Sequence, residues 1–411
     1  MKTVLITAYA VNPYKGSEDG TGWNITSEIA KDYKVILITR KNNVPFVEQY
    51  LKESDIPHLK NITCHGFDLS DFTMKMKKKV GERGYVAYYY MWQYRIVKFI
   101  QKSGFEFDIA HSLNFHSDSQ PNFLWKLGKP TFWGPIGHHP RVQKEFITKH
   151  YAYLNYVKDK LYGAVKWSFR NLDPYFKKAV KNSTKIFVIN SSVGKVISAP
   201  SDKVIKMPAV ASVPVADVDF NQKNDDEFVV LSVGRFHYMK GFDLTIEAFS
   251  KFIESLPEDL KEKCKLRLVG KGEEKETLEK LAKQKSIWKH IDWIDWVEKE
   301  EMENIYRTSD VFLFPSHEGA GMVVPEAMSY GLPIICLDNY GPGELVGDAG
   351  LKVKYASYKN VVLEFSKHLI NLINNKPLQE KLSQLALDRF KSHFTWEEKG
   401  LEIKKHYRHA I

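Results

Sequence analysis

The chain has 411 residues, of which 43% are hydrophobic and 13% aromatic, and its formal net charge is +10. This length predicts two or three domains at about 100–200 residues each, and the hydrophobic content excludes an intrinsically disordered chain. No apolar run reaches the ~18 residues that a membrane-spanning helix needs. The opening residues, MKTVLITAYAVNPYKG, predict a buried strand rather than a signal peptide, because their apolar stretch is short and runs into a polar, Gly-rich segment.

Short apolar runs alternate with helical patterns along the first half of the chain. The predicted strands are Val4–Ala8, Val35–Thr39, Phe107–His111 and Thr131–Trp133, and a helical pattern runs through Trp23–Ala30. Such alternation predicts parallel βαβ units.

The second half repeats this alternation more clearly. Its predicted strands are Phe228–Val233, Lys265–Val269, Val311–Phe314, Ile334–Leu337 and Leu351–Val353. Its predicted helices are Phe242–Ile253, Glu273–Gln284, Glu300–Thr308, Val323–Tyr330, Val361–Asn374 and an amphipathic tail at Trp396–His409. We therefore expect two doubly wound α/β halves, joined within the Pro-containing, polar segment Ala199–Asn224.

The positive charge is concentrated in the first half. Residues 1–200 contain 30 Lys+Arg against 16 Asp+Glu, whereas residues 201–411 contain 30 against 34. This excess favours an anionic partner such as a membrane surface, nucleic acid or a phosphorylated substrate. The cysteines, Cys64, Cys264 and Cys336, are odd in number and lack metal-ligand spacing, which indicates a reducing cytoplasm.

The most informative segment is Pro315–Pro333, PSHEGAGMVVPEAMSYGLP, where a predicted strand ends and a helix begins. Gly319 and Gly321 let the backbone approach a ligand, and the N–H groups at the start of a helix favour a phosphate. Glu318 and Glu326 would frame this site and accept hydrogen bonds from sugar hydroxyls. The alternative is an ordinary strand–helix turn in which Glu326 stabilises the start of the helix.

Glu318 and Glu326, with seven residues between them, resemble the EX7E motif of the retaining GT-B glycosyltransferases of family 4. Other segments of that family are matched in the same order: Ser232–Gly241 (SVGRFHYMKG), Leu268–Gly272 (LVGKG), Ser309–Ser316 (SDVFLFPS) and Gly341–Val346 (GPGELV). The resemblance covers nearly all of residues 228–350.

The resemblance implies a GT-B fold, in which two doubly wound Rossmann-like domains face each other across a cleft. Residues 1–205 would bind the acceptor and residues 206–390 the nucleotide-sugar. Residues 391–411 would form a helix that crosses back to the first domain.

The resemblance also assigns donor-site roles. Arg235 and Lys240 would bind the diphosphate, Glu318 would face the donor sugar, and Glu326 would accept hydrogen bonds from the ribose. A lone RxxxxK would otherwise be a solvated basic loop. The further donor-binding residues implied are Gly16, Gly270, Gly319, Ala320, Gly321, Met322 and Val323.

The segment Asn12–Gly22 (NPYKGSEDGTG) resembles the Gly-rich first loop of the same family. We expect a phosphate- or acceptor-facing loop here, with Gly20 and Gly22 on the acceptor side. Its GxxxGxG spacing does not match the dinucleotide pattern GxGxxG. The alternative is a mobile surface loop.

Histidines near the predicted strand Phe107–His111 suggest a further site residue. Relatives carry a His near this strand end that faces the donor sugar. His111 keeps that register better than His116, which would lie on the acceptor side. The alternative is a satisfied, half-buried histidine. Phe132–Pro140 (FWGPIGHHP) resembles a WGPxG loop, which would place Gly137 and His138 beside the acceptor; His138 and His139 are otherwise exposed loop residues.

One motif of a different glycosyltransferase fold is also present. Asp217-Val218-Asp219 spells DxD, a metal–nucleotide motif, but it lies in the joint between the halves rather than at the end of a predicted sheet. We interpret it as linker and predict neither a bound metal nor another cofactor.

Two stretches of the first half combine basic and aromatic residues. They are Lys75–Arg83 with the aromatic run that follows it, and Tyr151–Lys185. Amphipathic helices of this kind suit an anionic membrane surface or a lipid-diphosphate acceptor. Alternatively, the aromatics form core and the basic face is solvated. Nucleic acid is disfavoured because no nucleic-acid-binding motif accompanies the charge.

The resemblance therefore predicts a retaining glycosyltransferase that moves a sugar from a UDP-, GDP- or ADP-sugar to a glycan or lipid-linked acceptor in surface polysaccharide synthesis. The expected location is the cytoplasm, at the inner face of the cell membrane. Two alternatives stay open: a nucleotide-sugar epimerase or phosphorylase on the same fold, and a non-catalytic scaffold derived from a transferase.

Overall fold

The computed structural model describes residues 1–80, 82–215 and 226–410, so the Asp217–Asp219 motif lies outside the described residues. Several side chains of the Lys75–Arg83 stretch also lie outside the described part of the structure. The described chain divides into two compact units. Unit 1 contains residues 1–138, 164–209 and 396–411, and unit 2 contains residues 139–163 and 210–395. Residues 139–163 thus cluster with unit 2, although the sequence predicted one boundary near residue 205.

Unit 1 is built on a parallel sheet. Its strands are β1 (Thr3–Thr7), β2 (Lys34–Thr39), β3 (Ile62–Gly66), β4 (Ile109–Ser112), β5 (His116–Ser117), β6 (Thr131–Gly137), β7 (Lys185–Val188) and β8 (Val204–Lys206). They are ordered β3-β2-β1-β4-β6-β7-β8, and β5 pairs with β6. Apolar residues of these strands are buried on both faces, as a parallel sheet covered by helices requires.

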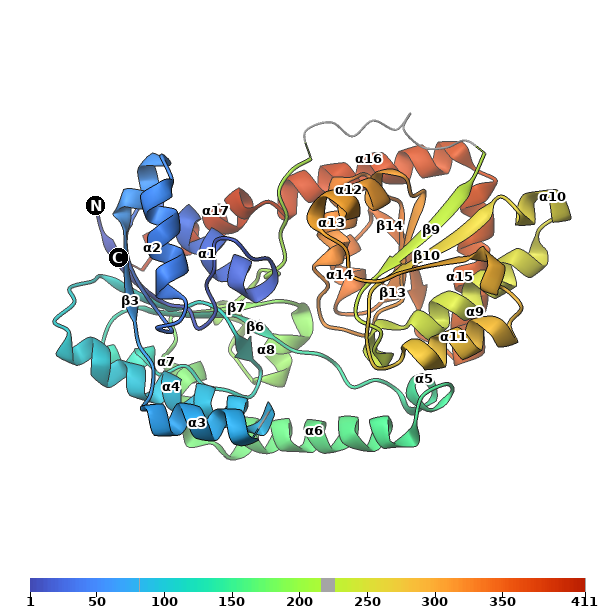
Figure 1. The fold of residues 1–411 in the computed structure, drawn as a ribbon. Helices are drawn as coiled ribbons and strands as arrows, with labels where there is room; N and C mark the ends of the chain where they lie inside the picture. The colour runs from blue at the N-terminus through green and yellow to red at the C-terminus, as the bar shows by residue number, and fades with distance from the viewer. Residues whose placement is uncertain (81, 216–225, 411) are drawn as a thin grey trace. The chain divides into compact units, whose positions relative to one another are not determined.

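Helices cover this sheet (Figure 1). They are α1 (Ser17–Ala30), α2 (Val44–Glu53), α3 (Asp71–Val80), α4 (Glu82–Lys102), α7 (Pro174–Asn182), α8 (Ser191–Val196) and α17 (Trp396–Arg408), together with the end of α6 (Tyr153–Leu172). The last helix, α17, packs on α1, where Gly400 lies against the side chain of Glu28. The end of the chain therefore returns to the unit that contains its start.

Unit 2 has a second parallel sheet. Its strands are β9 (Phe228–Val233), β10 (Cys264–Val269), β11 (Ile291–Ile294), β12 (Val311–Phe314), β13 (Ile334–Asp338) and β14 (Gly350–Lys354). The order is β11-β10-β9-β12-β13-β14. The chain thus builds outward from β9 in one direction and then, from β12, in the other. This reversal creates a topological switch point between β9 and β12, where ligands bind in doubly wound folds.

The helices of unit 2 pack on both faces of this sheet (Figure 1). They are α5 (Lys144–Thr148), the start of α6, α9 (Phe242–Ser255), α10 (Glu258–Lys261), α11 (Lys275–Gln284), α12 (Lys299–Arg307), α13 (Val323–Ser329), α14 (Pro342–Val346), α15 (Tyr358–Ile373) and α16 (Lys376–His393). One core cluster lies between the sheet and α9, α11 and α15, and another between the sheet and α13 and α16.

Two expectations for unit 1 were wrong. The segment predicted as a Gly-rich loop becomes helical at Ser17, so Gly20 and Gly22 lie inside α1. Gly22 serves packing there, because a Cβ at this position would overlap the carbonyl oxygen of Ala10. The segment predicted as a WGPxG loop instead continues strand β6 as far as Gly137.

Candidate functional site

The candidate site of unit 2 lies at the switch point between β9 and β12. The loop after β9 carries Arg235 and Lys240, and the loop after β12 carries Glu318. Because neighbouring parallel strands end at the same edge of the sheet, these loops meet there, although 78 positions separate Lys240 from Glu318. The topology therefore brings together two motifs that the sequence separates.

Lys240 and Glu318 form an ion pair at this edge. The Lys240 Nζ lies 2.5 Å from the Glu318 Oε2, and the side chains are only 18% and 21% exposed. Gly241, which follows Lys240, has a φ of +70° and lies so close to Pro315 that a Cβ would overlap its carbonyl oxygen. The glycine thus lets the two loops approach closely enough for the pair to form.

The loop after β13 packs against the loop that carries Glu318. The Asn339 amide donates a 2.8 Å hydrogen bond to the Ser316 carbonyl oxygen. Its Oδ1 accepts bonds from the backbone N–H groups of Gly341 and Gly343 at 3.0 and 3.3 Å. A Cβ at Gly341 would overlap the Glu318 carbonyl oxygen. The GPGELV segment is therefore a support for the Glu318 loop.

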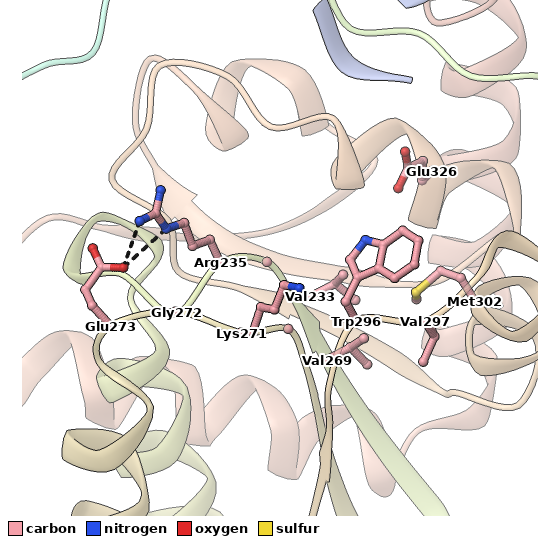
Figure 2. Close-up of a pocket in the computed structure, with 12 residues that line it drawn as sticks. Val233, Arg235, Val269, Lys271, Gly272, Glu273, Trp296, Val297, Met302 and Glu326 are labelled. Carbon is pink, nitrogen blue, oxygen red and sulfur yellow. Dashed lines mark hydrogen bonds and ion pairs between the residues drawn. The ribbon is translucent and has the colours of Figure 1, made fainter. Parts of the chain in front are cut away.

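A cavity of about 830 Å³ opens beside this edge. Figure 2 shows Arg235 and Glu273 at one end and Trp296, Met302 and Glu326 at the other. One end is thus charged, whereas the other combines an aromatic ring and a thioether with a carboxylate. This combination suits a ligand that has an anionic end, hydroxyl groups and a flat apolar end.

Arg235 is 71% exposed on its side chain, and its Nε and Nη2 donate to the Glu273 Oε2 at 3.2 and 3.0 Å. Lys271 lines the same cavity. An exposed ion pair contributes little to stability, so a phosphate could replace the carboxylate at low cost. The planar guanidinium offers a fork of donors that fits phosphate oxygens.

Glu326 lies near the start of α13 and accepts a 3.1 Å hydrogen bond from the Tyr306 hydroxyl. Burial raises the pKa of this carboxyl group, and the bond from Tyr306 offsets part of the rise. One carboxylate oxygen is thus fixed by the protein, while Glu326 also lines the cavity. Such a group can accept a hydrogen bond from a ligand hydroxyl.

Gly234 and Gly270, which both line the cavity, make a close backbone contact. Gly270 has a φ of +147° and Gly234 a φ of +155°, and a Cβ at Gly270 would overlap the carbonyl oxygen of Gly234. Gly270 therefore acts through backbone geometry, which keeps the ends of β9 and β10 close together.

The segment after Glu318 differs in part from expectation. The N–H of Gly319, expected to face a sugar or phosphate, donates a 3.0 Å bond to the Nδ1 of His139. Gly321 packs against the Phe314 ring, and Met322 is the residue before α13. Helix α13 itself, from Val323 to Ser329, is only seven residues long. Ala320 lies half-buried on the core side of this loop.

In unit 1, His111 is fully buried and both of its ring nitrogens are hydrogen-bonded. Its Nε2 faces the Gly134 carbonyl oxygen at 2.9 Å, so this nitrogen carries the proton, and Nδ1 accepts from the Tyr407 hydroxyl. Burial lowers the pKa of His111 to about 4. His111 therefore has the environment of a buried histidine with both ring nitrogens hydrogen-bonded, as the alternative interpretation of the sequence expected.

His116 is held in a similar way. Its Nδ1 lies 2.9 Å from the Tyr89 hydroxyl and its Nε2 lies 3.0 Å from the Ser112 hydroxyl. Burial lowers the pKa of His116 to about 3. Gly16 lies outside the helix, as the residue before α1, and has open space around it.

His138 directly follows β6 and forms a 2.7 Å bond with Asp118, which also pairs with Lys166 and Arg170. Burial alone would raise the pKa of Asp118, but the bonds from His138 and Lys166 hold it well below its usual range. This carboxylate therefore stays ionised and organises three basic side chains around it.

Sequence reasoning missed several residues of the site in unit 2. They are Lys271, Glu273, Trp296 and Met302 in the cavity, and Tyr306 behind Glu326. The position of Lys271 and Glu273, directly after a predicted strand, was a usable signal. Trp296 and Met302 come from the segment after β11, a strand that we did not predict. Among the described residues, no cluster of three or more His, Cys, Asp or Glu side chains could hold a metal ion.

Comparison with known proteins identifies the domain in unit 2. Residues 216–389 match the model of a family described as glycosyl transferases group 1. This segment forms most of unit 2. Unit 2 therefore contains most of the region that is similar to the glycosyl transferases group 1.

Sequence and structure comparisons support this assignment. An uncharacterized glycosyltransferase of Methanocaldococcus jannaschii is 27% identical over 275 residues, so the alignment spans 66% of either protein. WaaG, a glycosyltransferase involved in lipopolysaccharide biosynthesis, superposes with a TM-score of 0.59 over 97% of this chain and 99% of its own, at 18% identity. HepE of Anabaena, in complex with UDP and glucose, superposes with a TM-score of 0.58 over the full length of both chains, at 13% identity. Together with the two parallel sheets, these superpositions show a GT-B fold.

Proposed function

We propose that this glycosyltransferase domain belongs to a retaining enzyme of family 4. The enzyme would move a sugar from a nucleotide-sugar to a glycan or lipid-linked sugar in surface polysaccharide synthesis. The observation that carries this proposal is the meeting of Lys240 and Glu318 at the switch point, beside a cavity lined by Arg235 and Glu326. Involvement of WaaG in lipopolysaccharide biosynthesis supports the acceptor class.

In this proposal the donor lies along the cavity of unit 2. Its diphosphate would bind near Arg235 and Lys240, and its ribose hydroxyls would donate to Glu326. The base would lie at the end lined by Trp296, whose indole can stack on a flat ring. The donor is a UDP-, GDP- or ADP-sugar, and the presence of UDP and glucose in the HepE complex supports the first of these.

The transfer would proceed with retention of configuration at the anomeric carbon. The bond from that carbon to the diphosphate oxygen breaks, and the bond to the acceptor oxygen forms on the same face. The leaving diphosphate takes the acceptor proton. Arg235 and Lys240 would stabilise the negative charge that develops on the diphosphate, which is the main electrostatic requirement of such a step.

The proposed reaction needs no metal ion, because the two basic side chains supply the positive charge at the diphosphate. Treatment with EDTA should therefore leave the rate unchanged. All three cysteines are free, which fits a reducing compartment, and we place the enzyme in the cytoplasm at the inner face of the membrane. Within the described residues, no helix is long and apolar enough to cross a membrane.

Thermal unfolding in the presence of UDP, GDP, ADP, dTDP or CMP tests the donor assignment. A nucleotide at ~100 times its dissociation constant should stabilise the domain that binds it by about 2.7 kcal/mol. The Arg235→Ala and Glu326→Ala variants should lose this response. Transfer to candidate acceptors is then measured with the corresponding nucleotide-sugar.

The same assay separates the proposal from its alternatives. An epimerase or phosphorylase would turn over the nucleotide-sugar without a second sugar as acceptor. A scaffold would bind the nucleotide without turnover. If no nucleotide or nucleotide-sugar stabilises the protein, the transferase proposal is wrong.

A further inference from the structure

Helix α6 places its charged residues toward the protein in the part that belongs to unit 1. Lys166 is buried and its Nζ lies 2.8 Å from the Asp118 Oδ1. Arg170, one turn further along the same face, pairs with the other oxygen of Asp118. The inward face of this half of the helix is therefore ionic.

The outward face of the same half is apolar. Val165, Phe169 and Leu172, at helical spacing, are 45%, 41% and 70% exposed. Trp167, which lies on the opposite flank of the helix, is 57% exposed. This distribution of ionic and apolar side chains is the reverse of that in an ordinary surface helix, whose apolar stripe faces the core. A row of large exposed apolar side chains has an unfavourable contact with water, so such a face usually marks an interaction surface.

A basic cavity of about 390 Å³ lies at the end of this helix. Apolar side chains from α7 and from the end of α8 and the residue after it, among them Phe176, Val180 and Ile197, line its interior. The basic residues that line it are Arg170, Lys177, Lys181 and Lys203, and no acidic residue is among its described lining residues.

One of these basic groups is held in place. The Lys203 Nζ donates to the backbone carbonyl oxygens of Lys181 and Ser183 at 2.5 and 3.0 Å. Lys177 and Lys181 are exposed on one face of α7. The cavity thus combines an apolar interior with one hydrogen-bonded ammonium group and two exposed ones, which suits an amphiphilic anion.

We propose that this surface, the outward face of α6 from Val165 to Leu172 together with the basic cavity, binds the anionic phospholipids of a bilayer. The apolar side chains would enter the boundary between headgroups and acyl chains, and the lysines would contact lipid phosphates. This arrangement deepens the proposed function, because it names the surface and the lipid charge through which a membrane-associated transferase would reach a lipid-linked acceptor.

Charge complementarity favours a bilayer over a second copy of the chain. A second copy would present the same exposed basic residues, Lys177, Lys178 and Lys181, and so would offer this surface no complementary negative charge. An anionic bilayer instead offers negative charge around an apolar interior, which matches both parts of the surface.

Vesicle flotation of the full chain tests the proposal. The protein should float with vesicles of phosphatidylcholine mixed with phosphatidylglycerol, and not with vesicles of phosphatidylcholine alone. The Val165→Ser/Phe169→Ser/Leu172→Ser variant should lower the partition coefficient by roughly tenfold or more. The Lys177→Glu/Lys181→Glu variant should lower it by roughly fivefold or more for each lysine.

Matched variants outside the surface serve as controls. Leu363→Ser/Leu401→Ser removes exposed apolar side chains elsewhere, and Lys280→Glu/Lys359→Glu reverses two exposed lysines of unit 2. Both should bind vesicles like the unchanged protein. All variants should keep their thermal unfolding temperature and their nucleotide response, since the altered residues lie outside the cavity of unit 2.

Three results would overturn the proposal. The first is flotation that is absent or independent of phosphatidylglycerol. The second is stabilisation by inorganic phosphate or glycerol phosphate without vesicle binding, which indicates a soluble anion. The third is a dimer in sedimentation velocity that the apolar variant dissociates. Failure of the transferase proposal would be separate, since it would abolish the nucleotide response and leave flotation intact.

Discussion

The Lys240 ammonium and the Glu318 carboxylate lie 2.5 Å apart, across the switch point of the unit 2 sheet. Each residue follows one of two strands, β9 and β12, that are adjacent in the sheet. In the proposed site the pair has two uses. Glu318 orients the ammonium toward the incoming diphosphate, and the carboxylate is itself placed to accept a hydrogen bond from the donor sugar.

Replacement of Lys240 by Ala should lower the rate of transfer by roughly 10²–10³-fold, because a preorganised charge that stabilises a developing negative charge is lost. The unfolding temperature should also fall, because the Glu318 side chain, only 21% exposed, loses its partner. The rate is measured with the nucleotide-sugar that the thermal unfolding assay identifies.

The matched control is Lys275→Ala, which breaks an ion pair with Asp295 on the surface of the same unit. Its rate should equal that of the unchanged protein. A Lys240→Ala variant that transfers at the normal rate would exclude Lys240 from the donor site.

The buried carboxyl group of Glu326 predicts a pH dependence of donor binding. Burial raises its pKa above the ordinary 4.5, so the carboxylate becomes protonated at a higher pH than an exposed glutamate does. Protonation removes an acceptor for the ribose hydroxyls. Nucleotide affinity should therefore be highest above this pKa and should fall as the pH falls through it.

Isothermal titration of the nucleotide over a pH series measures this effect. The Glu326→Gln variant, which keeps the shape but cannot ionise, should bind more weakly, by roughly 10–100-fold for a lost charged hydrogen bond. It should also lack the acid-induced decrease assigned to Glu326. An identical pH profile in the variant would assign the effect to another group.

Gly270→Ala should destabilise unit 2 by about 3 kcal/mol or more, because the new Cβ overlaps the Gly234 carbonyl oxygen and the backbone φ is unfavourable for alanine. The unfolding temperature should fall by at least about 6 °C for a unit of this size. Gly16→Ala is the control, since open space surrounds Gly16. Equal unfolding temperatures would show that β9 and β10 can separate at this point without cost.

The sequence predicted the architecture of the second half well because its strands are strongly apolar and its turns contain glycine. The predicted Phe228–Val233 and Val311–Phe314 agree with β9 and β12 to the residue. Strand β11 was missed because its alternating residues, Ile291–Ile294, include Asp292 and resemble a surface segment. Strands β7 and β8 were missed because each is short and mixed with lysine.

The site could be predicted only in part, for a physical reason. A motif identifies residues that contact a ligand, but it does not give the partner that a side chain has when no ligand is present. Residue spacing in the sequence does not predict loop geometry. The bonds between Arg235 and Glu273 and between Gly319 and His139 depend on that geometry. His111 shows the same limit, because its position at a strand end is compatible with both a ligand contact and a buried hydrogen-bonded pair.

The buried pair of His111 and Tyr407 predicts acid sensitivity of unit 1. The pKa of His111 is lowered by burial from 6.5 to about 4, so the unfolded chain binds a proton between these pH values and the folded chain does not. The contribution of His111 to stability is complete above pH 6.5 and is lost as the pH falls toward 4, at about 1.4 kcal/mol per pH unit.

Tyr407→Phe removes the hydroxyl that donates to Nδ1 and leaves that nitrogen buried without its donor, so it should cost about 1–3 kcal/mol at neutral pH. Tyr14→Phe, which removes an exposed bond to Glu53, should cost far less. Urea unfolding of both variants over a pH series measures these differences, and a Tyr407→Phe variant as stable as Tyr14→Phe would show that water replaces the lost donor.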